Sequence, residues 1–403
     1  MRVLVLNQYF HPDSAATAQL LTELCEDLAT RHEIRVVCGR PSYNPTEPTF
    51  SRGLISHESH AGVRVSRVWS TTFDRSSMGG RLANYGTFLG CSLAGALAAP
   101  RPDLVIALTD PPPIGLIGVI AARLSGVPFV LVTQDIFPEV AIQLGRLSNP
   151  EVASALRLVS RRVLRSARRV VSIGRDMNGR LVELGVAPEK IVTIPGWADS
   201  LALRPLQGPS PLRRDWGLDG RFVVMHSGNV GFSQGLESLL QAAELLLDEP
   251  VVRFVIVGEG ASRAELQREA TRRRLDNVVF VPHQPRALLS QSLGAADVHL
   301  VSLRRGLAGY LVPSKMYGIL AAGKPFIAAV EAGSEPALVI DEYICGLRVE
   351  PGDPQRLADA VLEMRRAPLQ EMGRRARQAA EERYNRQRAS AAYLALLDQV
   401  TAG

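Results

Sequence analysis

The sequence predicts an α/β protein built from two parallel-sheet domains. Short runs rich in valine, isoleucine and leucine alternate with helical patterns along the chain, which indicates parallel sheets covered by helices. Most of these runs are continuously apolar rather than alternating, as expected for strands that are buried on both faces. The 403 residues are too many for one ordinary core and favour two domains of roughly 200 residues each.

The first half of the chain contains the first strand series, and its loops supply candidate acceptor-side residues. Strands are expected at residues 3–7, 34–39, 63–68, 104–109, 129–134, 170–173 and 191–195, with a helix at 18–31 after the first. Ligands of such sheets bind beyond the carboxyl ends of the strands, and the loops there carry His11, Asp13, Asp135 and Glu139. Spacing alone does not say which of these side chains face one another, and each could instead stabilise a turn.

A second strand series follows a segment that contains three prolines. This segment, residues 196–214, is the expected interdomain linker. Strands are then expected at residues 222–227, 253–257, 278–281, 298–303, 326–330 and 347–349. Residues 383–400 have the pattern of an amphipathic helix.

One stretch of the second half has the pattern of an anion site. Residues 312–329, VPSKMYGILAAGKPFIAA, predict a loop, a short helix and a buried strand. Ser314 is a good N-cap residue, and the backbone amides that follow it carry the positive end of the helix dipole. Lys315 adds a full charge at the same place, so we expect Ser314, Lys315 and Met316 to bind an anion. The alternative is a capped surface helix with a solvated lysine.

Lysine is rare in this arginine-rich chain. Lys190, Lys315 and Lys324 are its only lysines. Two of them bracket the expected helix, which suggests that a compact point charge is needed there. Gly323 is the expected C-cap, and Lys324 follows where a cation suits the carboxyl end of a helix.

Composition and charge exclude several classes of protein. A hydrophobic content of 46% with 21% charged residues is typical of a soluble globular protein. The net charge of +6 is modest, and no aromatic-interleaved basic motif predicts nucleic-acid binding. The 4 cysteines lie far apart without metal-ligand spacing and are expected to be reduced. Because the apolar runs are shorter than the roughly 20 residues of a spanning helix, we expect a cytoplasmic protein that could lie against a membrane.

An arginine-dense segment is the candidate for such membrane contact. Arg157, Arg161, Arg165 and Arg168 recur at helical spacing among apolar residues. A solvated helix face explains this pattern, and so does a patch attracted to anionic lipid at the inner face of the plasma membrane.

Eight stretches together resemble a known family. They are NQYFHPD, QDIFPEVAIQLG, IPGWAD, HSGNVGFSQGLESLL, FVIVGEG, NVVFVPHQP, AADVHLVSL and VPSKMYGILAAGKP. Their order and spacing resemble the GT-B glycosyltransferases of family 4, and within it the WbuB-type transferases of bacterial exopolysaccharide and lipopolysaccharide. The resemblance implies two Rossmann-like domains facing a central cleft: residues 1–200 for the acceptor and 215–382 for the nucleotide-sugar, with residues 383–403 as a helix that returns to the first domain.

The resemblance also implies a reaction. Such enzymes transfer a sugar with retention of configuration and without a metal, and the chain has no DxD motif. We expect a hexosyltransferase or N-acetylhexosaminyltransferase that uses a nucleotide-sugar substrate, UDP-linked, and no cofactor. The expected acceptor is lipid-linked or a polysaccharide of the cell envelope, and His11, Asp13, Asp135 and Glu139 are its candidate catalytic residues, with no base assigned.

The family's donor site maps onto several positions of this chain. The resemblance implies a phosphate-binding turn, a strand end that approaches the ligand, and a site that reads the base. Those positions are held by Gly228, Asn229, Gly231 and Gln234, by Gly258, and by His283 and Gln284. Many relatives carry an arginine near Asn229 and a lysine near Gln234. The neutral amides found here place more weight on Lys315 and Arg263.

The chain departs from the family at its paired glutamates. These would fall at Tyr310 and Gly318, and neither position is acidic. Glu335 is therefore the candidate acceptor for the ribose hydroxyls, although it could simply favour a helix N-terminus. The missing pair leaves two other functions open: a nucleotide-sugar-binding partner without catalysis, and a GT-B sugar-nucleotide epimerase.

Overall fold

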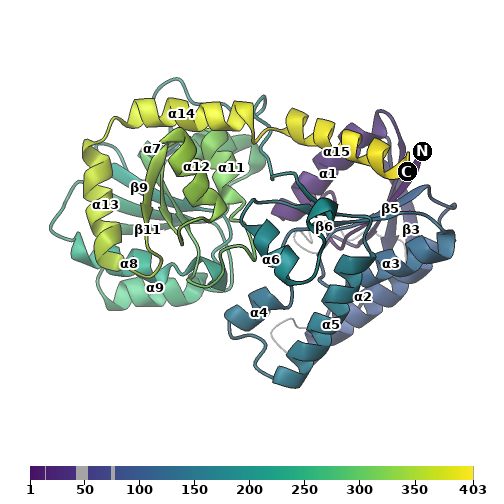
Figure 1. Ribbon diagram of the computed structural model, residues 1–403. Coiled ribbons are helices and arrows are strands. Elements are labelled where there is room, and N and C mark those ends of the chain that lie inside the picture. The colour runs from purple at the N-terminus through teal and green to yellow at the C-terminus, as the bar shows by residue number, and fades with distance from the viewer. Residues whose placement is uncertain (14, 42–52, 74–77, 403) are drawn as a thin grey trace. The chain divides into compact units, whose positions relative to one another are not determined.

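The computed structural model describes residues 1–13, 15–41, 53–73 and 78–402. The chain divides into two compact units, residues 1–195 with 387–403 and residues 196–386. Each unit is an open sheet with helices on its faces (Figure 1). In the part of the chain that the structure describes, no helix is long and apolar enough to cross a membrane.

The first unit is built on an eight-stranded sheet with the order β3-β4-β2-β1-β5-β6-β7-β8. All neighbouring strands run parallel except β3 and β4. The strands are β1 (Arg2–Leu6), β2 (Glu33–Gly39), β3 (Ile55–His60), β4 (Val63–Val68), β5 (Leu104–Ala107), β6 (Phe129–Thr133), β7 (Arg169–Ser172) and β8 (Ile191–Thr193). The seven strands expected from the sequence are confirmed, and β3 is an additional antiparallel edge strand.

Helices connect these strands and cover the sheet. They are α1 (Ala16–Ala29), α2 (Met78–Ala98), α3 (Ile114–Ser125), α4 (Glu139–Gln143), α5 (Pro150–Ser166) and α6 (Met177–Glu183). The terminal helix α15 (Arg386–Thr401) also belongs to this unit from Gln387 onward. Ser390 of α15 donates a short hydrogen bond to the Asp27 carboxylate of α1, which ties the end of the chain to its beginning.

The second unit is a six-stranded parallel sheet with the order β11-β10-β9-β12-β13-β14. Its strands are β9 (Phe222–Ser227), β10 (Val252–Val257), β11 (Val278–Val281), β12 (Val298–Ser302), β13 (Phe326–Ala329) and β14 (Gly346–Val349). All six were expected. Most of their apolar side chains are buried, Val224 and Phe254 completely, and burial of each such side chain contributes about 1.5 to 3 kcal/mol to folding.

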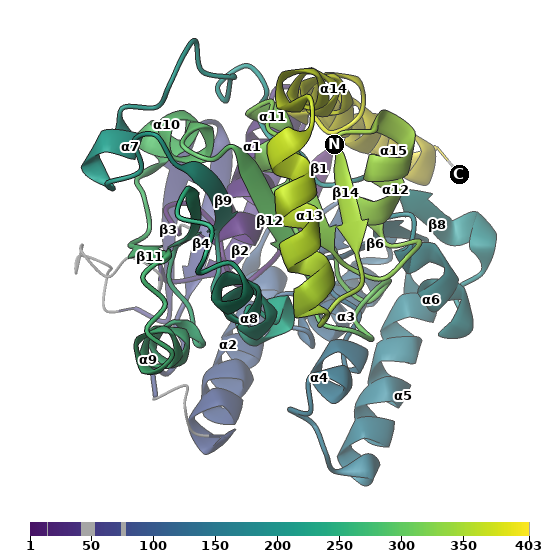
Figure 2. The same cartoon turned by 90° about the vertical axis from the view of Figure 1, so that its left-hand side faces the viewer.

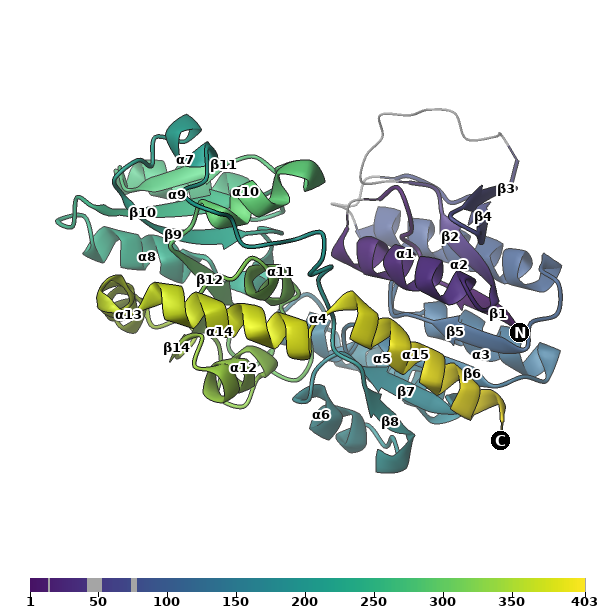
Figure 3. The same cartoon turned by 90° about the horizontal axis from the view of Figure 1, so that it is seen from above.

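The helices of the second unit lie on both faces of its sheet. They are α7 (Leu212–Asp215), α8 (Glu237–Leu245), α9 (Arg263–Arg272), α10 (Leu289–Gly294), α11 (Lys315–Ala321), α12 (Glu335–Tyr343), α13 (Pro354–Arg366) and α14 (Leu369–Glu382). Helices α8 and α13 pack side by side (Figure 2). Helix α14 lies along α11 and α12 (Figure 3). The short helix α11, which begins at Lys315, is therefore packed against α14.

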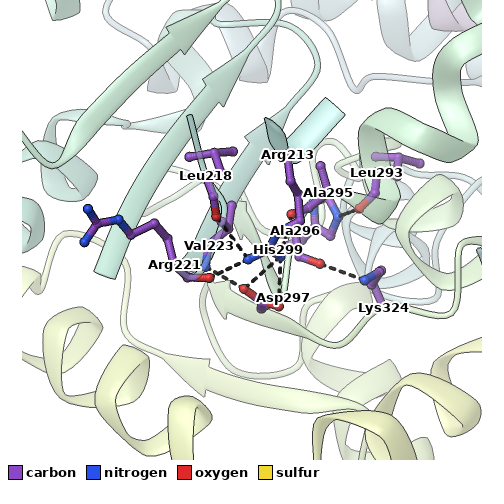
Figure 4. A network of polar contacts seen from close by, with 10 residues as sticks. All are labelled: Arg213, Leu218, Arg221, Val223, Leu293, Ala295, Ala296, Asp297, His299 and Lys324. Atoms are coloured by element: carbon purple, nitrogen blue, oxygen red, sulfur yellow. Dashed lines mark hydrogen bonds and ion pairs between the residues drawn. The ribbon is translucent and has the colours of Figure 1, made fainter. Parts of the chain in front are cut away.

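A polar network secures the amino ends of the central strands β9 and β12 (Figure 4). The Asp297 carboxylate accepts hydrogen bonds from the Val223 amide at 2.7 Å and from the Arg213 guanidinium at 3.1 and 3.2 Å. Lys324 donates to the Ala296 carbonyl at 2.8 Å. Lys324, the cation expected at the carboxyl end of α11, therefore binds the backbone just before the neighbouring strand β12. Gly323 adopts the left-handed conformation (φ 64°) expected of a residue that ends a helix.

Candidate functional site

Four turns of the second unit meet at the carboxyl edge of its sheet. The strand order β11-β10-β9-β12 places the segments that follow these strands next to one another. His283 and Gln284 follow β11, Gly258 and Arg263 follow β10, the stretch from Gly228 to Gln234 follows β9, and Ser314, Lys315 and Met316 follow β12. The topology therefore gathers these predicted donor residues along one edge.

The turns after β9 and β10 are bonded directly to each other. The Gly228 amide donates to the Val257 carbonyl at 3.0 Å, and the Val230 amide donates to the Glu259 carbonyl at 2.9 Å. A Cβ atom on Gly258 would lie 2.0 Å from the Gly228 carbonyl oxygen, so only glycine fits there. Gly258 therefore lies close to the backbone of the neighbouring turn, and its expected approach to a ligand stays a prediction.

Lys315 lies against the turn after β9. A Cβ atom on Gly228 would be 3.6 Å from Cε of Lys315 and 4.0 Å from its Cβ. The aliphatic part of the Lys315 side chain therefore packs beside Gly228, at a distance of ordinary van der Waals contact. Lys315 is half-buried and has no ion-pair partner among the described residues. Burial lowers the pKa of Lys315 to about 7, because the charged form is poorly solvated there.

The expected cap of α11 is only partly found. Ser314 occupies the N-cap position, but its backbone is helical and its side chain makes no capping hydrogen bond. The amides of Met316 and Tyr317 donate to the carbonyls of Pro313 and Ser314, both at 3.2 Å, and the Met316 side chain is fully buried. In the described part of the chain, the amides of Ser314 and Lys315 remain for an anion.

The side chains of Asn229 and Gln234 face their own turn. The Gln234 Oε1 atom accepts a hydrogen bond from the Gly231 amide at 3.0 Å. A Cβ atom on Gly231 would meet Asn229 Nδ2 at 3.0 Å. These two amides therefore shape the turn through which the backbone would approach a phosphate.

A residue that the sequence did not single out lies beneath this turn. His226 is fully buried, and its Nε2 atom lies 3.3 Å from the Asn229 carbonyl. Burial, and then the nearby charge of Lys315, hold the pKa of His226 well below its ordinary value. A neutral imidazole thus supports the turn. The sequence signal for this role is a histidine near the end of an apolar strand.

Arg263 and the residues after β11 hold neighbouring backbone. Arg263 donates to the Gly258 carbonyl and, at 2.9 Å, to the Val281 carbonyl. Its guanidinium also lies 5.8 Å from the centre of the Phe280 ring. Gln284 donates to the Pro282 carbonyl at 2.9 Å, and His283 is exposed. In this structure Arg263 links the ends of β10 and β11 through these hydrogen bonds. The contacts of His283 and Gln284 with a base stay predictions.

The carboxylate of Glu335 is hydrogen-bonded inside the second unit. Its side chain is 1% exposed, and its carboxylate accepts a hydrogen bond from the Tyr384 hydroxyl at 2.8 Å. The contact of Glu335 with ribose hydroxyls stays a prediction. Glu331 lies nearer the edge, and its Oε2 atom accepts from the amides of Gly306 and Ala308 at 2.9 and 3.3 Å. Glu331 therefore anchors the loop that leads to Lys315.

In the first unit the four candidate acceptor residues lie in two places. His11 and Asp13 follow β1, and Asp135 and Glu139 follow β6, with β5 between the two strands. Asp13 and Glu139 are buried, whereas Asp135 is exposed. Glu139 forms an ion pair with Arg157 at 3.0 Å, so one arginine of the expected lipid patch is committed to a carboxylate.

His11 belongs to a cluster that includes the unpredicted strand β3. Its ring stacks on that of His60 with centroids 3.8 Å apart and an interplanar angle of 16°. The His11 carbonyl accepts from Arg67, a buried arginine that also pairs with Glu58 of β3. Partial burial and the charges of His60 and Arg67 lower the pKa of His11.

The part of the chain that the structure describes contains no group of three or more histidine, cysteine, aspartate or glutamate side chains placed to hold a metal ion.

Comparisons with known proteins agree with this geometry. A family model described as "Glycosyl transferase 4-like domain" matches residues 16–197, and one described as "Glycosyl transferases group 1" matches residues 211–383. WcaI of Escherichia coli K12, named as a colanic acid biosynthesis glycosyl transferase, is 29% identical over 381 residues, which cover 90% of this chain and 91% of WcaI. WbjE of Pseudomonas aeruginosa, named as a glycosyltransferase, is 32% identical over 71% of this chain and 72% of its own length.

Solved structures share the fold over the whole chain. HepE of Anabaena in complex with UDP-glucose superposes with a TM-score of 0.75 at 19% identity, covering 99% of this chain and 100% of HepE. Sucrose-phosphate synthase of Thermosynechococcus elongatus superposes with a TM-score of 0.78 at 16% identity, covering 100% of this chain and 99% of the synthase. The chain therefore belongs to the GT-B glycosyltransferases of group 1, family 4, and is related to WcaI and WbjE.

Proposed function

We propose that the carboxyl edge of the second unit binds the diphosphate of a nucleotide-sugar, and that Lys315 is its charged anchor. The observation that carries this proposal is the position of Lys315: a half-buried ammonium, without an ion-pair partner among the described residues, packed over the glycine turn at Gly228. A charge that is already partly desolvated attracts an incoming anion more strongly than a fully solvated one.

The donor is proposed to be a UDP-sugar that carries a hexose or an N-acetylhexosamine. The HepE structures are described as complexes with UDP and UDP-glucose, which supports uridine. A mycobacterial relative, 28% identical over 90% of this chain, is named a GDP-mannose-dependent alpha-mannosyltransferase. A binding experiment must therefore decide whether the nucleotide base is uracil or guanine. His283 and Gln284 are the residues proposed to contact that base.

The reaction is proposed to be transfer with retention of configuration. The bond between the sugar C1 atom and the diphosphate oxygen breaks, the acceptor oxygen bonds to C1, and the acceptor proton passes to the leaving phosphate. Negative charge develops on the diphosphate as the bond breaks. A positioned cation and the amides of Ser314 and Lys315 would stabilise that charge. The acceptor side is proposed to involve His11, Asp13, Asp135 and Glu139, of which Asp135 is the exposed carboxylate.

The acceptor is proposed to be lipid-linked or a polysaccharide, presented at the inner face of the membrane. One helix of the first unit supports a peripheral contact. Leu158 and Val159 of α5 are 52% and 36% exposed, and Arg161 and Arg165 are exposed on the same helix. Apolar and basic side chains on one surface suit an anionic bilayer. Salt-sensitive binding to anionic vesicles is expected to weaken when Arg161 and Arg165 are replaced by glutamine, and unchanged binding would exclude this contact.

A transfer assay tests the proposed reaction. The full-length protein is incubated with UDP-sugars, with and without lipid-linked glycan acceptors, and the sugar-containing products are separated. Glycosylated acceptor that forms only when acceptor is supplied is the expected result, and Asp135→Asn is expected to lower its rate more than Asp248→Asn, a carboxylate of the second unit. Epimerised nucleotide-sugar in the absence of acceptor, or binding without any turnover, would contradict the proposal.

A further inference from the structure

A basic cavity lies in the first unit, at the end of the sheet opposite to the candidate acceptor residues. Its volume is about 700 Å³, which is within the range of small-molecule sites. Its lining includes Asp103, Pro128, Arg168 and Lys190, each of which directly precedes a strand of the sheet. The cavity therefore opens at the amino ends of the strands. Met1 and Thr401 also line it, and both ends of the chain lie close together there (Figure 1).

Three cationic side chains line this cavity, and two of them are held in position by hydrogen bonds. The Lys190 ammonium donates to the carbonyls of Arg165 and Ala167, both at 3.1 Å. The Arg123 guanidinium donates to the Ser166 hydroxyl at 3.2 Å. These contacts involve no carboxylate, so they orient the cations without neutralising them. Little side-chain entropy would then be lost when an anion binds.

The third cation, Arg168, is exposed and has no ion-pair partner among the described residues. Asp103 is the one carboxylate in the lining of the cavity. The Asp103 carboxylate interacts with Arg2: it accepts a hydrogen bond from the Arg2 amide at 2.7 Å, and the Arg2 guanidinium lies 3.7 Å from its second oxygen. That contact lowers the pKa of Asp103, so the carboxylate stays with Arg2. The positive charge of the cavity is therefore left uncompensated.

The remaining wall of the cavity is apolar. Val119, Val127, Phe129 and Val400 contribute to it. A ligand that suits this surface carries an anionic group at one end and apolar atoms beside it. Guanidinium and ammonium groups together favour phosphate, because arginine offers paired donors and lysine a point charge.

We propose that this cavity binds a phosphate-bearing ligand, whose phosphate group lies among Arg123, Arg168 and Lys190 and whose apolar portion lies against Val119 and Phe129. The phosphate could belong to a membrane lipid or to a soluble phosphate ester, since both present the same group. The site is separate from the donor edge at Lys315, and the proposal does not depend on the transfer reaction.

Two variants with the same loss of charge test this site. Arg123→Gln/Arg168→Gln removes two cations of the cavity. Arg31→Gln/Arg64→Gln removes two exposed cations of the first unit that line neither this cavity nor the surface of α5 proposed to contact a membrane. Both pairs are made in full-length Lys315→Ala protein, so that anion binding at the donor edge is weakened equally. Because all four arginines lie at the surface, unchanged thermal unfolding is expected and serves as the check of folding.

The variants are measured with a soluble and a membrane-bound phosphate. In the first arm, inorganic pyrophosphate is titrated by calorimetry. In the second arm, binding to phosphatidylglycerol vesicles is compared with binding to phosphatidylcholine vesicles. The cavity pair is expected to bind at least tenfold more weakly than the control pair in one arm, which identifies the source of the phosphate. Equal binding of the two pairs in both arms would overturn the proposal.

Discussion

Replacement of Gly258 by alanine should disrupt the joint between the turns after β9 and β10. The added Cβ atom would lie 2.0 Å from the Gly228 carbonyl oxygen, whereas a relaxed carbon-to-oxygen contact is about 3.3 to 3.6 Å. One of the two turns must therefore move by more than about 1 Å. Gly258 also has a φ of 128°, in a region that an alanine side chain disfavours by about 1 to 3 kcal/mol.

These two effects set the size of the expected loss. Displacement of packed backbone costs about 1 to 3 kcal/mol, so with the backbone strain the free energy of unfolding should fall by about 2 to 6 kcal/mol. Since Gly228 also supports Lys315, nucleotide affinity should fall as well. Denaturant unfolding and calorimetric titration with UDP measure the two losses.

Gly352 provides the matched control. Its φ is 78°, and a Cβ atom there would meet nothing within 4 Å, so Gly352→Ala introduces the backbone strain without the clash. It should cost about 1 to 2 kcal/mol and leave nucleotide binding unchanged. If Gly258→Ala were no more destabilising than Gly352→Ala, the direct contact between the two turns would be refuted.

Three further predictions concern single side chains. Asp297→Asn should lower the free energy of unfolding by about 1 to 3 kcal/mol in denaturant unfolding, because it breaks the charged contact with Arg213. Tyr384→Phe should cost about 1 to 3 kcal/mol in the same assay, because it removes the hydroxyl that donates to the buried carboxylate of Glu335. Nucleotide affinity should fall by up to tenfold per pH unit above pH 7, because Lys315, with a pKa of about 7, must be protonated to hold the diphosphate; titrations from pH 6 to pH 9 follow this change.

Each of these predictions has its own control. Asp359→Asn changes an exposed carboxylate that pairs with Arg356 at 3.4 Å, and a loss equal to that of Asp297→Asn would contradict the importance of the network. Tyr343→Phe removes a hydroxyl that donates to an exposed carboxylate at 3.3 Å and should cost less than Tyr384→Phe. Lys315→Arg keeps its charge up to pH 9, so an equally steep decline in that variant would show that another group titrates.

Most of the fold could be predicted because buried parallel strands are continuously apolar. Runs such as residues 222–227 and 129–134 identified strands within one or two residues of their ends. Strand β3 escaped prediction because its sequence, ISHESH, has a single apolar side chain and its residues are largely exposed. It is an edge strand that pairs with β4 through its backbone, and its sequence lacks the apolar pattern of a buried strand.

The candidate site was predictable where a local signal existed. The rarity of lysine and the position of Lys315 directly after the expected N-cap Ser314 led to its prediction as an anion-binding residue. The role of Gly258 could be foreseen only as a close approach, because its partner, Gly228, lies on another strand.

Contacts between distant residues had no local signal. Glu335 was predicted from its place at a helix start, and nothing in the local sequence indicated its hydrogen bond with Tyr384, which is 49 residues away. Glu139 and Arg157 each had a separate predicted role, and the structure pairs them. Such pairings depend on the packing of whole helices, which single-residue patterns do not encode.

The most direct test of the account is calorimetric titration of the full-length protein with UDP, GDP and ADP, repeated on Lys315→Ala. We predict selective binding of UDP, weakened by roughly 1.5 to 3 kcal/mol in the variant, which is the range for a hydrogen bond to a charged group. Equal binding of the three nucleotides would contradict the uridine assignment. Unchanged UDP affinity in Lys315→Ala would contradict the central claim that this lysine anchors the diphosphate.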